Sequence, residues 1–183
     1  KFLLANFFGG LVVYLDKPFK VGHWIRSPDK NIEGIVEHIG WRVTRIRTFE
    51  KRPLYVPNSF FLNISVENAT RMSNRRIKTV ISIRYQDADK IEVLTQELKQ
   101  MLMEHDGVDK RQIIMVHLTD LGASSLDILV DACTKATKRV DYQAVRHDIL
   151  IHVLRIVEAN DAECAFPTQT LFLESQDGPS PLC

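Results

Sequence analysis

Residues 2–15 read FLLANFFGGLVVYL, and Asn6 is their one strongly polar side chain. A helix on the surface of a soluble domain carries a polar face opposite its apolar stripe, and this segment has no such face. Its nine large apolar side chains would forfeit on the order of 14–27 kcal/mol if they stayed in water. A whole domain is stable by only about 5–15 kcal/mol. The segment must therefore be buried.

Two interpretations of this segment stay open, a buried core helix and one half of a broken transmembrane helix. As a helix its 14 residues would reach about 21 Å, less than the roughly 30 Å hydrocarbon core of a membrane. A secretory signal is excluded because residues 16–18, Asp-Lys-Pro, stand where a cleavage site would lie. Gly9 and Gly10 each cost a helix about 1 kcal/mol relative to Ala, which close packing of membrane helices would explain. Pro18 predicts the end of the helix, since the residue before a proline disfavours the α region.

The remaining chain divides into two regions. Between about residues 19 and 72, short β-branched and aromatic runs alternate with turn formers, which predicts a small barrel or sandwich. From residue 75 the elements follow the order β-α-β-β-α-β of a ferredoxin-like domain. They are a strand at 76–84, a helix from near Asp89 to Gly107, strands at 112–118 and 126–134, a helix at 142–159 and a strand at 166–174. The predicted fold class is therefore α+β.

Both helices of the second region are predicted from an apolar stripe. Asp89 and Glu92 have the spacing of a capping box at the start of the first helix. Its stripe is Ile91, Leu94, Leu98 and Met101/Leu102, and that of the second helix is Tyr142, Val145, Ile149, Val153 and Ile156.

The sequence contains no group of residues that would indicate an enzyme. The three cysteines, Cys133, Cys164 and Cys183, lie far apart and form no CxxC pair, which favours a reducing compartment. The sequence has no glycine-rich phosphate-binding motif. His147 and His152 are five residues apart, which is not the spacing that places two ligands on one helix face. We therefore expect no catalytic residues, no metal and no cofactor.

Charge is unevenly distributed, although the formal net charge is only +1. Residues 40–80 hold nine Lys and Arg against two acidic residues, whereas from residue 158 onward there are five acidic residues and no Lys or Arg. In the predicted strand at 41–48, Arg45 and Arg47 share one face and Thr44 and Ile46 the other. A soluble Sm-like RNA-binding module, with these arginines on phosphates, therefore stays open as an alternative.

Several stretches, read together, resemble the MscS-like mechanosensitive channels. NFFGGLVVYLDKPFKVG at 6–22 is similar to the end of the family's pore helix and its turn into the cytoplasm. EGIVEHIG at 33–40 and YVPNS at 55–59 are similar to its β domain, and LGASSL at 121–126 to a loop of its α/β domain. The low-conductance YnaI-type branch is resembled more closely by IRSPDKNIE at 25–33, SVEN at 65–68 and FPTQTL at 166–171. The resemblance covers about residues 1–174 in the family's order.

The resemblance implies a homoheptameric, tension-gated channel that releases ions and small solutes on hypo-osmotic shock. Residues 1–17 would be the cytoplasmic half of the pore-lining helix, with membrane lipid around the channel. The protein would be a multi-pass protein of the bacterial inner membrane, with the chain from about residue 18 onward in the cytoplasm. No nucleic acid is expected. The later regions would be a β domain at 18–72, an α/β domain at 73–165, a C-terminal β-barrel strand at 166–174 and a flexible tail at 175–183.

The resemblance also implies roles for individual residues. Packing between pore helices is expected at Asn6, Gly9, Gly10 and Val13, and pore lining at Lys1, Leu4 and Phe8. The turn from the helix to the β domain is expected at Pro18, Phe19 and Gly22, and the C-terminal barrel at Phe166, Pro167, Gln169 and Leu171. His23 stands where the family usually has an acidic residue, which puts any contact made by that acid in question.

Overall fold

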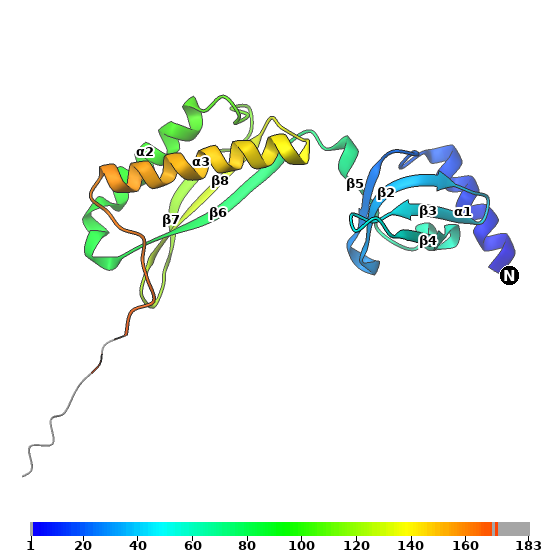
Figure 1. Cartoon of the computed structure of the whole chain (residues 1–183), viewed down its shortest axis with the longest axis horizontal. Coiled ribbons are helices and arrows are strands. Elements are labelled where there is room, and N and C mark those ends of the chain that lie inside the picture. The colour runs from blue at the N-terminus through cyan, green and yellow to red at the C-terminus, as the bar shows by residue number, and fades with distance from the viewer. Residues whose placement is uncertain (1, 170, 172–183) are drawn as a thin grey trace, which may run out of the picture. The chain divides into compact units, whose positions relative to one another are not determined.

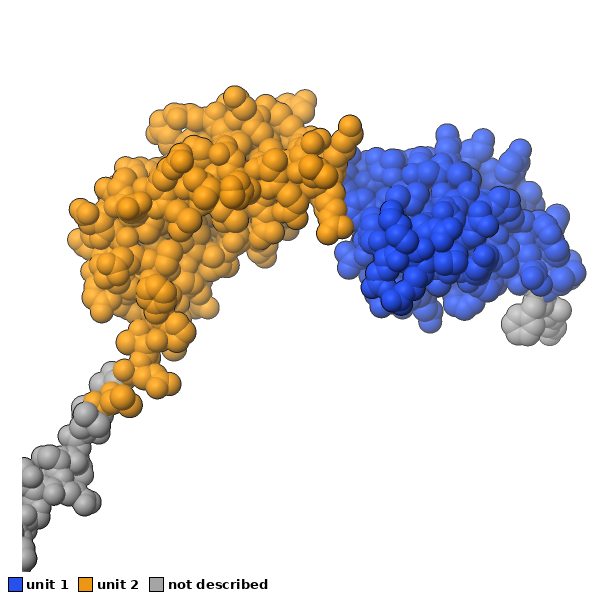
Figure 2. Space-filling view, viewed as in Figure 1, with its two compact units in different colours: residues 1–73 blue, residues 74–183 orange. Residues whose placement is uncertain are grey.

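The structure, a computed structural model, describes residues 2–169 and 171. It combines helices and strands, which confirms the predicted α+β class. The chain forms two compact units, Lys1–Ser73 and Asn74–Cys183 (Figure 1, Figure 2). We call them unit 1 and unit 2.

Unit 1 consists of one helix and an antiparallel sheet with the strand order β4-β3-β2-β1-β5. The helix α1 (Phe2–Asp16) ends two residues before Pro18, as predicted. The strands are β1 (Trp24–Ser27), β2 (Ile32–Ile39), β3 (Val43–Arg47), β4 (Pro53–Pro57) and β5 (Glu67–Asn68). The 3-10 turns are η1 (Pro28–Lys30), η2 (Asn58–Leu62) and η3 (Ala69–Arg71).

Among the side chains of α1 that the structure describes, only Val13 enters the core of unit 1. Val13 is buried with Phe19, Ile25, Val36 and Ile46. Most other large apolar side chains of α1 are exposed, so the interpretation of this segment as a core helix is wrong.

Unit 2 packs two helices against a three-stranded antiparallel sheet with the order β6-β8-β7 (Figure 1). Its elements are β6 (Arg75–Ile83), the 3-10 turn η4 (Tyr85–Lys90), α2 (Ile91–Glu104), β7 (Met115–Leu121), β8 (Leu126–Thr134) and α3 (Arg139–Ala159). The predicted apolar stripes are confirmed, because both helices turn them toward one core that they share with the sheet. Residues 166–169 and 171 lie outside any strand, and residues 170 and 172–174 lie outside the described part of the chain.

Two local predictions in unit 2 are wrong. Lys90, and not Asp89, precedes the first residue of α2, and no side chain caps the helix. The reason is that η4 runs directly into α2, with the Ile91 N–H already bonded to the Ala88 carbonyl. Strand β7 begins later than residue 112, because the Gln112 N–H closes a turn onto the Asp109 carbonyl at 3.1 Å.

Candidate functional site

One face of α1 docks on η2, which directly follows β4. Asn6, Gly9, Gly10 and Val13 follow one another at helical spacing and share this face. The Ser59 N–H donates a hydrogen bond to Asn6 Oδ1 at 3.0 Å. The residues predicted to pack between pore helices therefore have a neighbour within the chain.

The two glycines of α1 allow this docking. A Cβ at Gly9 would lie 2.4 Å from the Asn58 carbonyl oxygen, and one at Gly10 would lie 2.8 Å from Asn58 Nδ2 and 2.9 Å from the Trp41 carbonyl oxygen. Real Cβ atoms do not approach heavy atoms so closely. Glycine is required here by the chain's own β domain, so packing between helices is not needed to explain it.

Asn58 holds the start of η2 in place beneath α1. It is fully buried, and its Oδ1 accepts from Thr44 Oγ1 while its Nδ2 donates to the Gly40 carbonyl, both at 2.8 Å. Its backbone N–H donates to the Arg42 carbonyl at 2.9 Å. Because buried polar groups are costly unless they are bonded, these contacts fix the surface that α1 meets.

The predicted turn from helix to β domain occupies the exit of α1. Phe19 is buried, with its ring centroid 5.0 Å from that of Phe61. Gly22 has a φ of 89°, a conformation that favours glycine, and its N–H donates to the Val36 carbonyl at 2.7 Å. Pro18 is exposed and its carbonyl oxygen accepts from Asn68 Nδ2 at 2.8 Å. This exit is therefore fixed to the sheet on several sides.

His23 lies beside the same asparagine. Its Nδ1 is 3.0 Å from Asn68 Nδ2. A neutral His23 that carries its proton on Nε2 can accept a hydrogen bond from that amide, as a carboxylate at this position could. Position 23 therefore still offers Asn68 a hydrogen-bond acceptor.

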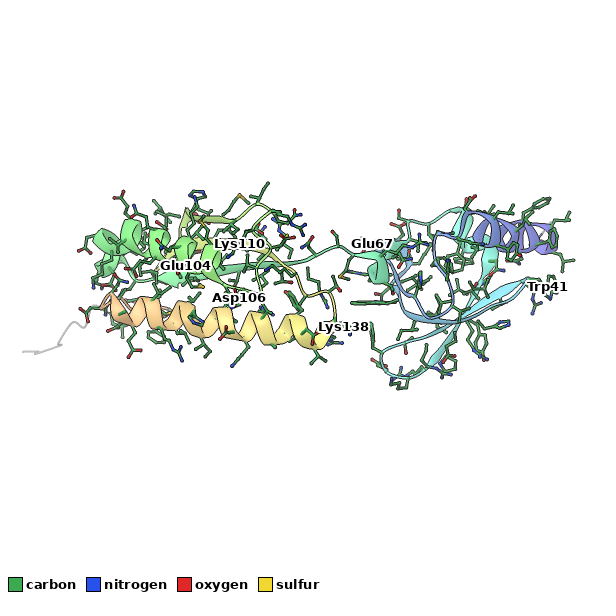
Figure 3. All side chains as sticks on the ribbon, turned by 90° about the horizontal axis from the view of Figure 1, so that it is seen from above. Trp41, Glu67, Glu104, Asp106, Lys110 and Lys138 are labelled. Carbon is green, nitrogen blue, oxygen red and sulfur yellow. The ribbon has the colours of Figure 1, made fainter. Side chains whose placement is uncertain are left out.

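The opposite face of α1 carries large exposed apolar side chains. Leu4 is 63% exposed and Phe8 is 54% exposed. Trp41, in the turn between β2 and β3, is also largely exposed (Figure 3). Lys1, the third predicted pore-lining residue, lies outside the described residues.

The arginines that suggested RNA binding are paired within the sheet. Thr44 and Ile46, on the other face of β3, are buried. Both Arg47 Nε, at 2.7 Å, and Arg45 Nε, at 3.0 Å, contact the Glu37 carboxylate on β2. The Arg47 hydrogen bond, followed by the charges of the two guanidinium groups, lowers the pKa of Glu37. Glu37 on the neighbouring strand thus partly neutralises the basic face of β3. The RNA-binding alternative is not supported.

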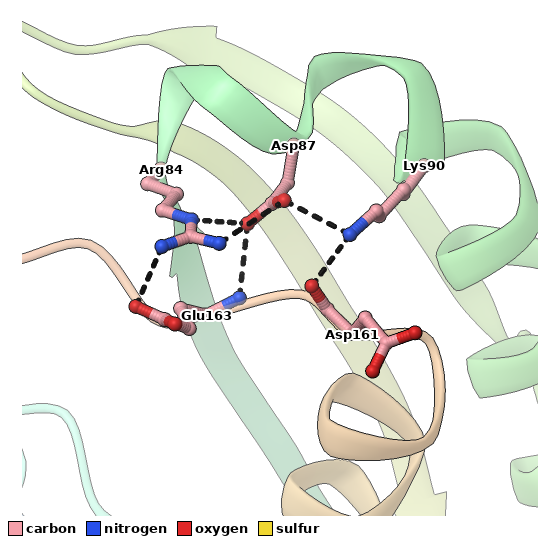
Figure 4. A network of polar contacts seen from close by, with 5 residues as sticks. All are labelled: Arg84, Asp87, Lys90, Asp161 and Glu163. Atoms are coloured by element: carbon pink, nitrogen blue, oxygen red, sulfur yellow. Dashed lines mark hydrogen bonds and ion pairs between the residues drawn. The ribbon is translucent and has the colours of Figure 1, made fainter.

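A charged network holds the segment that follows α3 (Figure 4). Asp87, which is nearly fully buried, accepts from Arg84 Nε at 2.6 Å, from the Glu163 N–H at 3.0 Å and from Lys90 Nζ at 3.1 Å. The Arg84 hydrogen bond is the main reason why the pKa of Asp87 falls to about 2. Beyond this network the predicted barrel residues Phe166, Pro167, Gln169 and Leu171 are all exposed.

One further pair of side chains in unit 2 has no signal in the sequence. His105, at the end of α2, contacts Asp148 of α3 through Nε2 at 2.9 Å, and its Nδ1 accepts the Gly107 N–H at 3.0 Å. These side chains are 43 residues apart, so no local spacing could predict the contact. Within residues 2–169 and 171, no three His, Cys, Asp or Glu side chains are grouped to hold a metal ion.

Both units match models of channel domains. Residues 3–71 match the mechanosensitive ion channel β-domain, and residues 77–164 match the C-terminal domain of the mechanosensitive ion channel MscS. Because these two matches cover most of the chain, it belongs to the MscS family of mechanosensitive channels.

Individual relatives place the chain within the family. It is 48% identical to the low conductance mechanosensitive channel YnaI of Escherichia coli over 96% of this chain and 51% of YnaI, which confirms the YnaI-type resemblance. It is 33% identical to the small-conductance mechanosensitive channel MscMJ of Methanocaldococcus jannaschii over 95% of this chain and 49% of MscMJ. The chain thus spans about half the length of these relatives.

Solved structures agree with the fold. The closed-state crystal structure of Helicobacter pylori MscS has a TM-score of 0.81 at 25% identity, covering 94% of this chain and 66% of that one. Arabidopsis thaliana MSL1 gives a TM-score of 0.84 at 23% identity, covering 90% of this chain and 59% of that one. Among the residues described here, no helix combines the length and the apolar character needed to cross a membrane.

Proposed function

We propose that this chain is part of a subunit of a tension-gated ion channel, with α1 as the cytoplasmic half of its pore-lining helix. The observation that carries the proposal is the contrast between the two faces of α1. One face fits the chain's own β domain through Gly9 and Gly10, whereas the other exposes Leu4, Phe8 and further large apolar side chains. An apolar surface of this kind marks a contact with a membrane or with another protein chain.

Further copies of the helix around a shared axis, with lipid around them, would cover this apolar face. We propose a homoheptamer in the bacterial inner membrane, with membrane lipid around it and ions and small solutes passing along its axis. Lys1, Leu4 and Phe8 line the pore in this arrangement, and the chain from about residue 18 onward is cytoplasmic. Tension favours the state that occupies more membrane area, which shifts the population toward an open pore. No catalytic chemistry is part of this function.

A finer assignment concerns the end of the chain. We propose a ferredoxin-like unit 2 in which residues 166–174 leave as the strand of a C-terminal barrel shared by the subunits. Two observations support the ferredoxin-like arrangement. In the sheet of unit 2 the third strand, β8, lies between the first, β6, and the second, β7. A β-α-β-β-α-β domain of the ferredoxin-like kind requires this order. A bridge between Ile83 and Cys164 brings the chain back beside β6, where a fourth strand belongs.

The full-length protein tests the function directly. Reconstituted into lipid patches, it is expected to give currents that appear only under membrane tension, and particles in detergent are expected to show sevenfold symmetry. A correctly inserted heptamer that stays electrically silent under tension up to patch rupture would contradict the proposed channel activity. A stable monomer in detergent would contradict the proposed assembly.

A further inference from the structure

The segment that leaves unit 1 is bonded to the exit of α1. Asn68 Nδ2 donates to the Pro18 carbonyl oxygen at 2.8 Å, and Arg71 Nη2 donates to the Lys17 carbonyl oxygen at 3.1 Å. The end of a helix leaves carbonyl groups without partners in the helix and favours a nearby cation. These two side chains therefore donate hydrogen bonds to the exit of α1, although they lie about 50 residues further along the chain.

The same segment is fixed to the sheet of unit 1. Asn68 pairs with Ile25 in the ladder between β5 and β1. The Trp24 N–H donates to Thr70 Oγ1 at 2.7 Å. Residues 67–71 are thus held on two sides, by the helix exit and by β1.

Unit 2 anchors its own first residue. Asn74 Nδ2 donates to Asp109 Oδ2 and to the Thr134 carbonyl, both at 3.0 Å. Asp109 and Thr134 are buried, and Arg111 hydrogen-bonds to the Asp109 carboxylate at 3.0 Å. Asn74 is therefore tied to a fixed part of unit 2 and not to a mobile loop.

Only Met72 and Ser73 stand between the two anchored ends. A chain reaches at most about 3.3–3.6 Å per residue, so a connection of this length has little slack. We propose that residues 68–74 form a mechanical link through which a load on unit 2 reaches the exit of α1. Asn68 and Arg71 are its positioning residues. This inference rests on the proposed function, because it takes α1 to be the pore helix, and it concerns an attachment separate from the docking at Asn6 and Gly9.

The test applies a load to unit 2 of the full-length channel. Val140, which is 80% exposed on α3, is replaced by cysteine in a background where the other cysteines are serine, and the new thiol is biotinylated. Streptavidin is then added to the cytoplasmic side of an excised patch while the tension threshold is measured. We expect streptavidin to shift the threshold of this parent, and we expect the shift to be lost when Asn68→Ala and Arg71→Ala are combined.

Two matched variants separate the link from general damage. Arg52→Ala removes another exposed arginine of unit 1, one paired with Glu50, and is expected to keep the full shift. Arg71→Lys keeps a donor at the helix exit and is expected to retain part of it. Unchanged single-channel conductance and elution volume in detergent show that each variant folds and assembles.

Each remaining outcome has a definite meaning. A streptavidin shift of equal size in the double variant and the parent overturns the link. A parent whose threshold does not respond to streptavidin overturns it as well, since a load on unit 2 then fails to reach the pore helix. Absence of any tension-activated current in the parent would instead remove the proposed channel function.

Discussion

The helices α1 and α2 are almost equal in length but bury their residues in different ways. The 14-residue α2 buries Ile91, Leu94, Leu98 and Leu102 in the core of its own unit. The 15-residue α1 buries Gly9, Gly10 and Val13 and leaves side chains such as Leu4 more than half exposed. The core of unit 2 thus takes up the apolar face of α2, whereas α1 is attached through Asn6, its two glycines and Val13 and leaves most of its large apolar side chains exposed.

The largest difference is expected when one leucine of each helix is replaced by alanine. Leu98 is fully buried, so Leu98→Ala should reduce the free energy of unfolding of unit 2 by about 2–5 kcal/mol. Leu4→Ala, at an exposed position, should change the stability of the 183-residue chain by no more than about 0.5 kcal/mol. Hydrogen exchange of the β8 amides measures the first and urea unfolding the second. Equal losses at the two positions would contradict the contrast.

A second prediction concerns the attachment of α1. Gly9→Ala places a methyl group against the Asn58 carbonyl oxygen, and overpacking of this kind costs about 1–3 kcal/mol. Alanine also favours the helix itself by about 1 kcal/mol, so α1 should stay helical while it moves away from η2. The hydrogen bond from the Ser59 N–H to Asn6 should then break, and hydrogen exchange at Ser59 should become faster.

The control for this variant lies on the opposite face of the same helix. Leu15 is 63% exposed, so Leu15→Ala should leave exchange at Ser59 unchanged. If Gly9→Ala left the Ser59 amide as protected as in the parent, the glycine would not be needed for docking.

The elements of unit 2 followed from the sequence more fully than the contacts of α1. The stripe of Leu94 and Leu98 predicts a buried helix face because helical period and burial coincide. Gly9 and Gly10 indicate a close approach, but a glycine does not specify what approaches it, and the family resemblance suggested a neighbouring helix. The structure adds a second surface, the start of η2 at Asn58, 49 positions after Gly9.

Other contacts had no local signal at all. Arg71 bonds to the Lys17 carbonyl oxygen across 54 residues, and His105 meets Asp148 across 43. Spacing rules describe one helix or one strand, so they cannot find pairs that the tertiary fold creates. The prediction of a capping box at Asp89 was wrong because the preceding 3-10 turn, η4, already bonds the first amide of α2.

The attachment of α1 and that of the segment after α3 differ in charge. The Ser59 N–H donates to Asn6, a neutral amide, whereas the Glu163 N–H donates to the Asp87 carboxylate. The Arg84 hydrogen bond, with help from the Glu163 amide and Lys90, lowers the pKa of Asp87 from 3.8 to about 2. Acid should therefore act on one attachment and spare the other.

The smallest expected effect follows from this difference and, in the unsubstituted chain, is confined to acid. Because the pKa of Asp87 is lower in the folded chain than in the unfolded chain, its contribution to stability is complete above about pH 4 and is lost as the pH falls toward 2. Exchange protection factors, which correct for the intrinsic effect of pH, should fall at Glu163 over that interval and stay constant at Ser59. Asp87→Asn has no carboxylate to protonate, so its Glu163 amide should be less protected at neutral pH and should show no step in acid. A parallel fall at both amides would mean that acid unfolds the whole chain, and the contrast between a charged and a neutral attachment would then be lost.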